Sequence, residues 1–170
     1  MKRYHLSKDR HLKLRFSADW RESATGKPSG FYYDIDLDWL RWLDGENYFD
    51  NDGWMRSYLY EVEIEASRLL LIHDLKTFDA FNLEYQRPLM EGLNMKIIDW
   101  KRVAENYAGV EIAPYFWPRR LHMDYFWYHG WDCASGVVWQ PGGIKSIGLK
   151  IAGKQKIIDF YRQNRSRDHE

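Results

Sequence analysis

The stretch Lys27-Pro28-Ser29-Gly30-Phe31-Tyr32-Tyr33-Asp34 is the part of the sequence around which the rest of the chain is organised. Pro28 and Gly30 predict a bend, because proline fixes one backbone torsion and glycine accepts conformations that other residues avoid. Tyr32 and Tyr33 follow the bend directly. The stretch therefore predicts either a turn that leads into a buried aromatic strand or a place where a flat ligand lies against a ring.

The composition limits the kind of protein. The chain has 170 residues, of which 45% are hydrophobic and 17% aromatic, and this suits one packed domain. The 25 basic and 25 acidic residues balance, so no overall charge argues for nucleic acid or an anionic membrane surface. One cysteine, Cys133, cannot form an internal disulfide, and six scattered histidines add no metal-ligand spacing. Because no apolar run has the length of a signal peptide or a membrane span, we expect a cytoplasmic protein without metal and without membrane contact.

Short strands and a few helices alternate along the sequence. Alternating or continuous apolar residues predict strands at 4–7, 58–64, 69–72, 110–115, 136–139 and 146–151. Aspartates that can cap a helix, followed by glycine or proline stops, predict helices at 36–45, 74–88 and 99–109. This mixture predicts an α+β fold.

Two further expectations concern the first helix and the ends of the domain. Asp36 is the expected cap of helix 36–45, and Trp39, Trp42 and Leu43 have the spacing of its core face. We expect one domain over residues 1–160. The charged residues 161–170 are expected to form a C-terminal tail.

Three pieces of the sequence resemble a known family when they are taken in chain order. His5 and Ser7 share one face of the first predicted strand, Gly30-Phe31-Tyr32-Tyr33 follows a loop, and acidic residues occur in a late aromatic region. This order resembles the ADP-ribosyltransferase superfamily, and the Gly-x-Tyr-aromatic element is similar to that of its His-Tyr-Glu branch. The resemblance implies a split β-sheet core with flanking helices.

The resemblance also implies a reaction. It makes NAD the substrate, with the nicotinamide–ribose bond cleaved and ADP-ribose passed to a macromolecular acceptor, either protein or nucleic acid. It places His5 in the histidine role and Tyr32 in the tyrosine role. Because the cleavage develops positive charge on the ribose, such a site needs groups that hold the sugar, support the leaving ring and place negative charge nearby.

Other residues of the same region are expected to bind NAD. Ser7 would add a contact beside His5. Gly30 and Phe31 belong to the platform for the nicotinamide ring, and Tyr33 is the alternative to Tyr32 as the stacking residue. Lys27 is expected to steer a phosphate of NAD.

The acid is where the sequence departs from the family's pattern. No late Gln-x-Glu or Glu-x-Glu occurs, and Glu61 and Glu63 come earlier than the family's order places the acid. Asp132, in a loop that leads into the predicted strand 136–139, is the best substitute for the late glutamate. A turn capped by Asp132 through its own backbone is the structural alternative.

Three other functions stay open. A protein of the same fold that binds a nucleotide or a partner without catalysis is favoured by the missing glutamate. An RNA 2′-phosphotransferase-like enzyme would use arginines, and Arg3, Arg10 and Arg15 lie near His5. An interaction module whose tryptophans form a partner surface would show a large exposed aromatic patch and no deep cleft.

Overall fold

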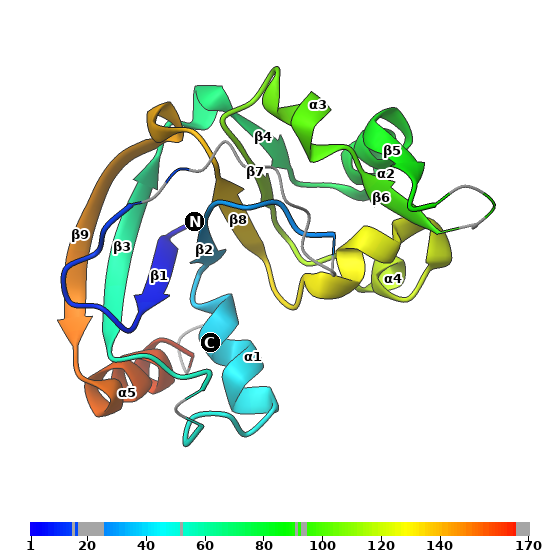
Figure 1. The fold of residues 1–170 in the computed structure, drawn as a ribbon. Coiled ribbons are helices and arrows are strands. Elements are labelled where there is room, and N and C mark those ends of the chain that lie inside the picture. The colour runs from blue at the N-terminus through cyan, green and yellow to red at the C-terminus, as the bar shows by residue number, and fades with distance from the viewer. Residues whose placement is uncertain (15, 17–25, 52, 91, 93–94, 166–170) are drawn as a thin grey trace.

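A mixed sheet of seven strands forms the centre of the fold, in the order β4-β7-β8-β2-β1-β3-β9 (Figure 1). The structure is a computed structural model, and it describes residues 1–14, 16, 26–51, 53–90, 92 and 95–165. Neighbouring strands are antiparallel except β4 and β7, which run parallel. The predicted α+β class and the single domain are confirmed. Arg15 and Trp20, in the loop expected before Pro28, lie outside the described residues.

The seven strands of the large sheet agree closely with the predicted ones, but the hairpin of two short strands was not predicted, and the helix predicted at 74–88 ends at Tyr85, where the first strand of that hairpin begins. The seven strands are β1 (Arg3–Ser7), β2 (Phe31–Ile35), β3 (Tyr58–Ile64), β4 (Leu69–Ile72), β7 (Gly109–Ile112), β8 (Ser135–Val138) and β9 (Ile144–Ala152), with a separate hairpin of β5 (Gln86–Pro88) and β6 (Lys96–Ile98). The α-helices are α1 (Asp38–Gly45), α2 (Leu75–Tyr85), α3 (Trp100–Ala104), α4 (Trp117–Arg120) and α5 (Lys154–Arg165). Short 3-10 segments are η1 (Ala66–Arg68), η2 (Met123–Gly130) and η3 (Pro141–Gly143).

The sheet opens between β1 and β2. These two strands pair only between Arg3–Tyr4 and Asp34–Ile35, whereas β1 stays paired with β3 as far as Ser7 and β2 with β8 from Phe31 onward. Beyond their short contact the two strands diverge. The sheet therefore has two halves, β4-β7-β8-β2 and β1-β3-β9, which lie on different sides of Figure 1.

Two groups of helices cover one face of this sheet. On the β1-β3-β9 half, α1 and α5 pack against Tyr4 and Leu59 and form one apolar cluster, which includes Leu40, Leu43, Ile157, Ile158 and Tyr161. On the other half, α2, α3 and η2 form a second cluster with the strands, which includes Val110, Ile112, Val137, Phe78, Trp100 and Trp127. The two groups lie over different halves of the sheet (Figure 1).

The opposite face carries a buried polar network that crosses four strands. Arg3 of β1 donates from Nε to Oε2 of Glu111 at 2.6 Å and from Nη2 to Oε1 at 3.0 Å. Tyr33 of β2 donates to the same Oε2 at 2.9 Å. Its ring lies over Gly136 of β8, where an added Cβ would come within 2.2 Å of Tyr33 Cζ. The missing side chain at Gly136 thus lets Tyr33 reach across β8 to β7.

The start of α1 differs from the prediction. Asp36 does not cap the helix; Asp36 and Leu37 form a turn with positive φ values of 50° and 64°. Instead, the carboxylate of Asp34 at the end of β2 accepts the backbone N–H of Trp39 at 2.9 Å. A strand residue satisfies a helix N–H group here because the turn folds α1 back against β2.

The predicted core face of α1 is confirmed for Leu43 and only in part for the two tryptophans, which pack against the core cluster without being fully buried. Leu40 and Leu43 are the buried residues of the helix, whereas Trp39 and Trp42 are half-buried. The two indole rings stack on each other at 4.7 Å between centroids, and Trp54 packs against both. Trp39 and Trp42, which were expected in the core, therefore form a partly exposed aromatic cluster with Trp54.

The end of the chain forms a helix rather than a tail as far as Arg165. In α5, Tyr161 is buried together with Ile157 and Ile158, so residues 161–165, expected as part of the charged tail, continue a packed helix. Residues 166–170 lie outside the described residues. The helix predicted at 99–109 begins as expected at a cap from Asp99 but ends earlier, at Ala104. Within the described ranges, no helix has the length and apolar character needed to cross a bilayer.

Candidate functional site

A cavity of about 230 Å³ lies where β1 and β2 diverge. Its lining includes His5 from β1, Lys27 from the segment before β2, Tyr32 from β2 and Asp132 from the loop before β8. These residues come from three regions that are far apart in the sequence, because Lys27 and Tyr32 belong to one stretch. The split in the sheet therefore brings the histidine, the tyrosine and the acid singled out in the sequence to one concave site.

His5 fills part of the gap between the two strands. Its Nδ1 lies 2.7 Å from the carbonyl oxygen of Tyr32, and its ring packs on Phe31 at 4.5 Å between centroids. A carbonyl only accepts hydrogen bonds, so Nδ1 carries the proton and Nε2 is the acceptor of the ring. Burial lowers the pKa of His5, which favours this neutral form.

Tyr32 offers an aromatic face that is held in place. Its hydroxyl donates to the carbonyl of Pro28, and the edge of Trp131 packs near its ring. The ammonium of Lys27 lies 5.4 Å from the centroids of both rings. Burial lowers the pKa of Lys27, while the nearby Asp132 carboxylate acts in the opposite direction. The wall thus combines the fixed aromatic ring of Tyr32 with the cation of Lys27.

Asp132 lies in the cavity wall and is anchored by Arg120 of α4. Nη2 of Arg120 donates to Oδ1 of Asp132 at 3.0 Å, and its Nη1 donates to the Tyr115 hydroxyl at 2.6 Å and to the Trp131 carbonyl at 2.7 Å. The side chain of Asp132 keeps an exposed fraction of 23%. A single guanidinium therefore orients the acid and the loop that carries it.

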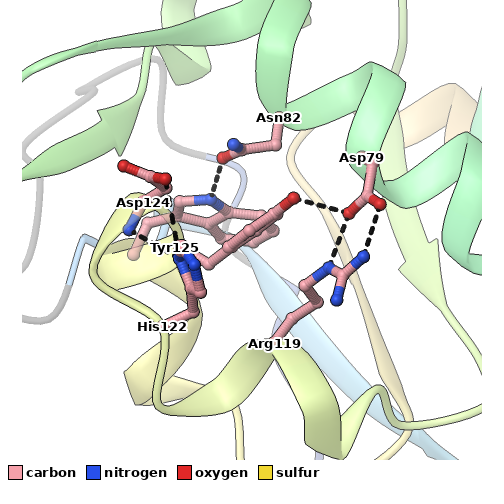
Figure 2. Close-up of polar contacts among 7 residues, drawn as sticks. Asp79, Asn82, Arg119, His122, Asp124 and Tyr125 are labelled. Atoms are coloured by element: carbon pink, nitrogen blue, oxygen red, sulfur yellow. Dashed lines mark hydrogen bonds and ion pairs between the residues drawn. The ribbon is translucent and has the colours of Figure 1, made fainter.

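The preceding residue, Arg119, is directed to a different element. Its Nε and Nη2 donate to the two carboxylate oxygens of Asp79 on α2 at 2.8 and 2.6 Å, and the Tyr125 hydroxyl donates to Asp79 at 2.6 Å (Figure 2). This cluster joins α2 to α4 and η2. Because Arg119 fixes α4 on one side and Arg120 meets the cavity wall on the other, α4 connects the helical cover to the site.

Asp34 is a second carboxyl group of the cavity, and no role was predicted for it. It lies on the same face of the sheet as Tyr4 and Ser135, with which it is paired. Burial raises the pKa of Asp34 to about 7, although the N–H of Trp39 acts in the opposite direction. The only signal in the sequence was its place at the end of the aromatic strand, where the period of two puts it on the face of Tyr32.

The outer part of the cavity is aromatic and basic. Trp39 of α1, Trp54 and Arg56 belong to the lining, and Trp54 is 42% exposed. The helical spacing of Trp39 predicted a core position, because spacing alone cannot separate a core face from the wall of a cavity.

Four of the residues predicted to bind NAD make contacts within the protein that explain their presence without a ligand. The Ser7 hydroxyl accepts the N–H of Asp9 at 3.0 Å, and Phe31 packs on His5; neither belongs to the cavity lining. Gly30 approaches β8 rather than an open cavity, because an added Cβ would lie 2.7 Å from the carbonyl oxygen of Val138. Tyr33 borders the cavity, but its hydroxyl is committed to the network on the opposite face.

The alternative acids lie elsewhere. Glu61 accepts from Lys150 at 2.8 Å and Glu63 from Ser146 at 2.8 Å, both between β3 and β9. Neither borders the cavity. Cys133 does border it, but burial raises the pKa of its thiol, which disfavours the reactive thiolate.

Comparisons with protein-family models, with curated proteins and with solved structures gave no match. Among the residues that the structure describes, no group of three His, Cys, Asp or Glu side chains is placed to hold a metal ion.

Proposed function

We propose that the protein is an NAD-dependent ADP-ribosyltransferase with the split-sheet core of that superfamily, acting on a macromolecular acceptor. One observation carries the proposal. His5, Tyr32 and Asp132, the residues to which the family resemblance gives the histidine, tyrosine and acid roles, line one cavity at the opening of the sheet.

The size and lining of the cavity suit one end of a dinucleotide. Ligand sites generally measure about 300–1,000 Å³, so about 230 Å³ holds a nicotinamide and its ribose rather than the whole molecule. The other half would extend past Trp54 and Arg56 at the outer part of the cavity. Lys27 and Arg56 supply positive charge suited to a pyrophosphate, and Trp54 supplies a face suited to a base.

The protein's own groups match the needs of the bond cleavage. Nε2 of neutral His5 accepts a hydrogen bond from a ribose hydroxyl, and the bond of Nδ1 to the Tyr32 carbonyl keeps the ring oriented. Tyr32 supports the nicotinamide ring by stacking. Asp132 places a negative charge on the side where the ribose becomes positive.

The proposed reaction is balanced without a further reactant. NAD supplies a positively charged leaving group, so when the ribose–nicotinamide bond breaks, its electron pair leaves with neutral nicotinamide. The acceptor's nucleophile bonds to the ribose carbon and releases one proton, for which Asp132 is the nearest proposed base. Without an acceptor, water takes the nucleophile's place and the product is free ADP-ribose.

An assay with NAD labelled in its ADP-ribose half tests the proposal directly. We expect the purified protein to release nicotinamide and to label a macromolecule in a cell lysate. His5→Ala and Tyr32→Ala should lower both signals while circular dichroism shows a retained fold. No nicotinamide release and no labelled product with the wild-type protein would refute the enzymatic proposal.

The second candidate is a nucleotide-binding protein of the same fold without catalysis. Arg120 favours it, because its ion pair with Asp132 at 3.0 Å neutralises the charge that the reaction needs. Calorimetric NAD binding without nicotinamide release selects this candidate.

The other two candidates receive less support. Arg3 is paired with buried Glu111 on the opposite face and Arg10 does not border the cavity, so neither provides the arginine that an RNA phosphotransferase site needs; Arg15 is outside the described residues. An interaction module is favoured by exposed Trp54 and Trp117, but Trp54 belongs to the lining of a defined cavity.

A further inference from the structure

Two carboxyl groups border the cavity of the proposed site, those of Asp34 and Asp132. Asp132 is paired with Arg120 at 3.0 Å, and the ammonium of Lys27 also lies within reach of its charge. Asp34 is different: among the residues that the structure describes, it takes part in no ion pair, and its carboxylate accepts the N–H of Trp39 at 2.9 Å. The cavity thus contains one carboxyl that the protein neutralises and one that it does not.

Asp34 lies at the inner end of the cavity. It is paired with Tyr4 in the last pair that β1 and β2 form before they diverge, and both residues border the cavity. Asp34 is only 6% exposed, so its carboxyl has little contact with bulk water. A charge at such a buried position interacts with a ligand more strongly than one in water, because less solvent screens it. A ligand that fills the cavity therefore meets the Asp34 carboxyl at its inner end.

The bond from Asp34 to the start of α1 does not require a carboxyl group. Asparagine or serine accepts a backbone N–H at the start of a helix as well as aspartate does. The carboxyl has a cost, because burial, with Asp38 and Asp36 acting in the same direction, raises the pKa of Asp34 to about 7, and its ionisation opposes folding. An ionisable group that is held in a cavity at a cost to stability indicates a role in binding.

We propose that the ionised carboxyl of Asp34 is the counter-charge for a cationic ring bound in the cavity, and that it makes the site select such a ring over a neutral ring of the same shape. Tyr32 supplies the aromatic face for the ring, and Asp34 supplies the charge. The bound cation gives the buried carboxylate the partner that the protein itself does not provide. One extension rests on the proposed function: the site selects NAD over its reduced form, because only the oxidised nicotinamide ring is a cation.

The role of Asp34 makes this binding depend on pH. The carboxyl is neutral well below its pKa and charged above it, so the cation binds more tightly as the pH rises past about 7. Other titratable or charged groups act on Asp34 or border the same cavity: Tyr4 and His5 of β1, Lys27, Tyr32, Tyr33, Asp36, Asp38 of α1, Arg56, Asp132 and Cys133. His5 and Lys27 lose positive charge over the same rise in pH. The pH dependence is therefore measured against a variant that lacks only the Asp34 carboxyl.

Two probes that differ by one charge test the proposal. They are nicotinamide riboside, whose ring is a cation, and benzamide riboside, in which carbon replaces the charged ring nitrogen. By calorimetric titration of the wild-type protein, we expect nicotinamide riboside to bind about tenfold more tightly than benzamide riboside at pH 8 and about twofold or less at pH 5. Asp34→Asn should lower the preference at pH 8 to about twofold. Glu63→Gln is the matched control, because it removes the same charge from an exposed residue that does not border the cavity.

Three results overturn the proposal: no saturable binding of nicotinamide riboside, a preference that is equal at pH 5 and pH 8, or the wild-type preference in Asp34→Asn at pH 8. Urea denaturation checks that both variants fold, and Asp34→Asn keeps an oxygen that can accept the N–H of Trp39. If the wild-type protein shows the expected preference but releases no nicotinamide from NAD, the proposed function fails and the cation site stands. If it releases nicotinamide while Asp34→Asn keeps the full preference, the proposed function stands and the role of Asp34 fails.

Discussion

Tyr32 and Tyr33 are neighbours in the sequence, but β2 turns their side chains to opposite faces of the sheet. Tyr32 lines the cavity, whereas Tyr33 donates to Glu111 on the other face. The alternation of a strand gives each tyrosine a different task, because successive side chains point in opposite directions. The pair therefore allows binding and stability to be tested separately.

Tyr32→Ala should weaken NAD binding about tenfold, because the loss of one stacking contact costs about 1 kcal/mol or somewhat more. Tyr32→Phe keeps the ring and should bind within about twofold of the wild-type protein. Tyr33→Phe should leave NAD affinity unchanged and lower the free energy of unfolding by about 1–3 kcal/mol, since Glu111 loses a buried donor. Calorimetric titration and urea denaturation measure the two effects, and equal NAD affinity of Tyr32→Ala and the wild-type protein would remove Tyr32 from the site.

Asp34 makes stability depend on pH. Its pKa is about 7 in the folded protein and about 4 in an unfolded chain, so ionisation opposes folding. The favourable contribution of the protonated carboxyl is complete below pH of about 4 and is lost as the pH rises to about 7.

We therefore expect the stability difference between Asp34→Asn and the wild-type protein to change in favour of the variant by about 2–3 kcal/mol as the pH rises from 5 to 8. The asparagine oxygen can still accept the N–H of Trp39, so the cap is kept. Urea denaturation of both proteins at the two pH values measures the difference. A stability difference that does not change with pH would show that the carboxyl is already ionised at pH 5.

At the scale of elements, two glycines allow β2 and its side chains to lie close to strand β8. Gly136 leaves the space over which the Tyr33 ring lies, and Gly30, before β2, leaves space for the backbone of β8 itself. Glycines at both places are explained by packing between strands, and neither opens a route for a ligand.

Gly136→Ala should destabilise the protein by about 1–3 kcal/mol or more, because its Cβ would meet the Tyr33 ring at 2.2 Å. Gly148→Ala on β9 is the matched control, since its Cβ would meet nothing within 4 Å and should change stability by less than about 0.5 kcal/mol. Thermal and urea denaturation compare the two. Equal stability of the two variants would mean that Tyr33 moves aside at little cost.

At the scale of the whole molecule, the Arg3–Glu111–Tyr33 network holds the two halves of the sheet together on one face, while the other face opens into the cavity. The side chain of Glu111 is fully buried, and that of Arg3 is 18% exposed. In such a largely buried ion pair, removing one partner leaves the other charge buried without its countercharge.

Glu111→Gln should lower the free energy of unfolding by about 3 kcal/mol, because Arg3 then lacks its countercharge. Glu61→Gln is the control, since the Glu61–Lys150 pair is partly exposed and worth about 1 kcal/mol or less. Chemical denaturation at neutral pH measures both. A loss no greater for Glu111 than for Glu61 would show that the network does not join the two halves.

The parts of this fold that could be predicted are those fixed by local pattern. The strands Tyr58–Ile64 and Leu69–Ile72 have the predicted bounds, and α2 follows its cap Asp74, because alternation, apolar runs and capping act within a few residues. Helix α5 was missed, and of the three residues predicted for the core face of α1 only Leu43 is fully buried. Their apolar residues are recognised only from what they pack against.

The sequence alone determined the α+β class and most strand positions, and its resemblance to a known family singled out His5, Tyr32 and Asp132 as candidate site residues. Only the tertiary structure decided that these three line one cavity, that Asp34 joins them and that Tyr33, Gly30 and Ser7 have structural contacts instead. The physical reason is the two-residue pairing between β1 and β2. The point at which two strands diverge depends on the helices and strands packed around them, and no local pattern in either strand records it.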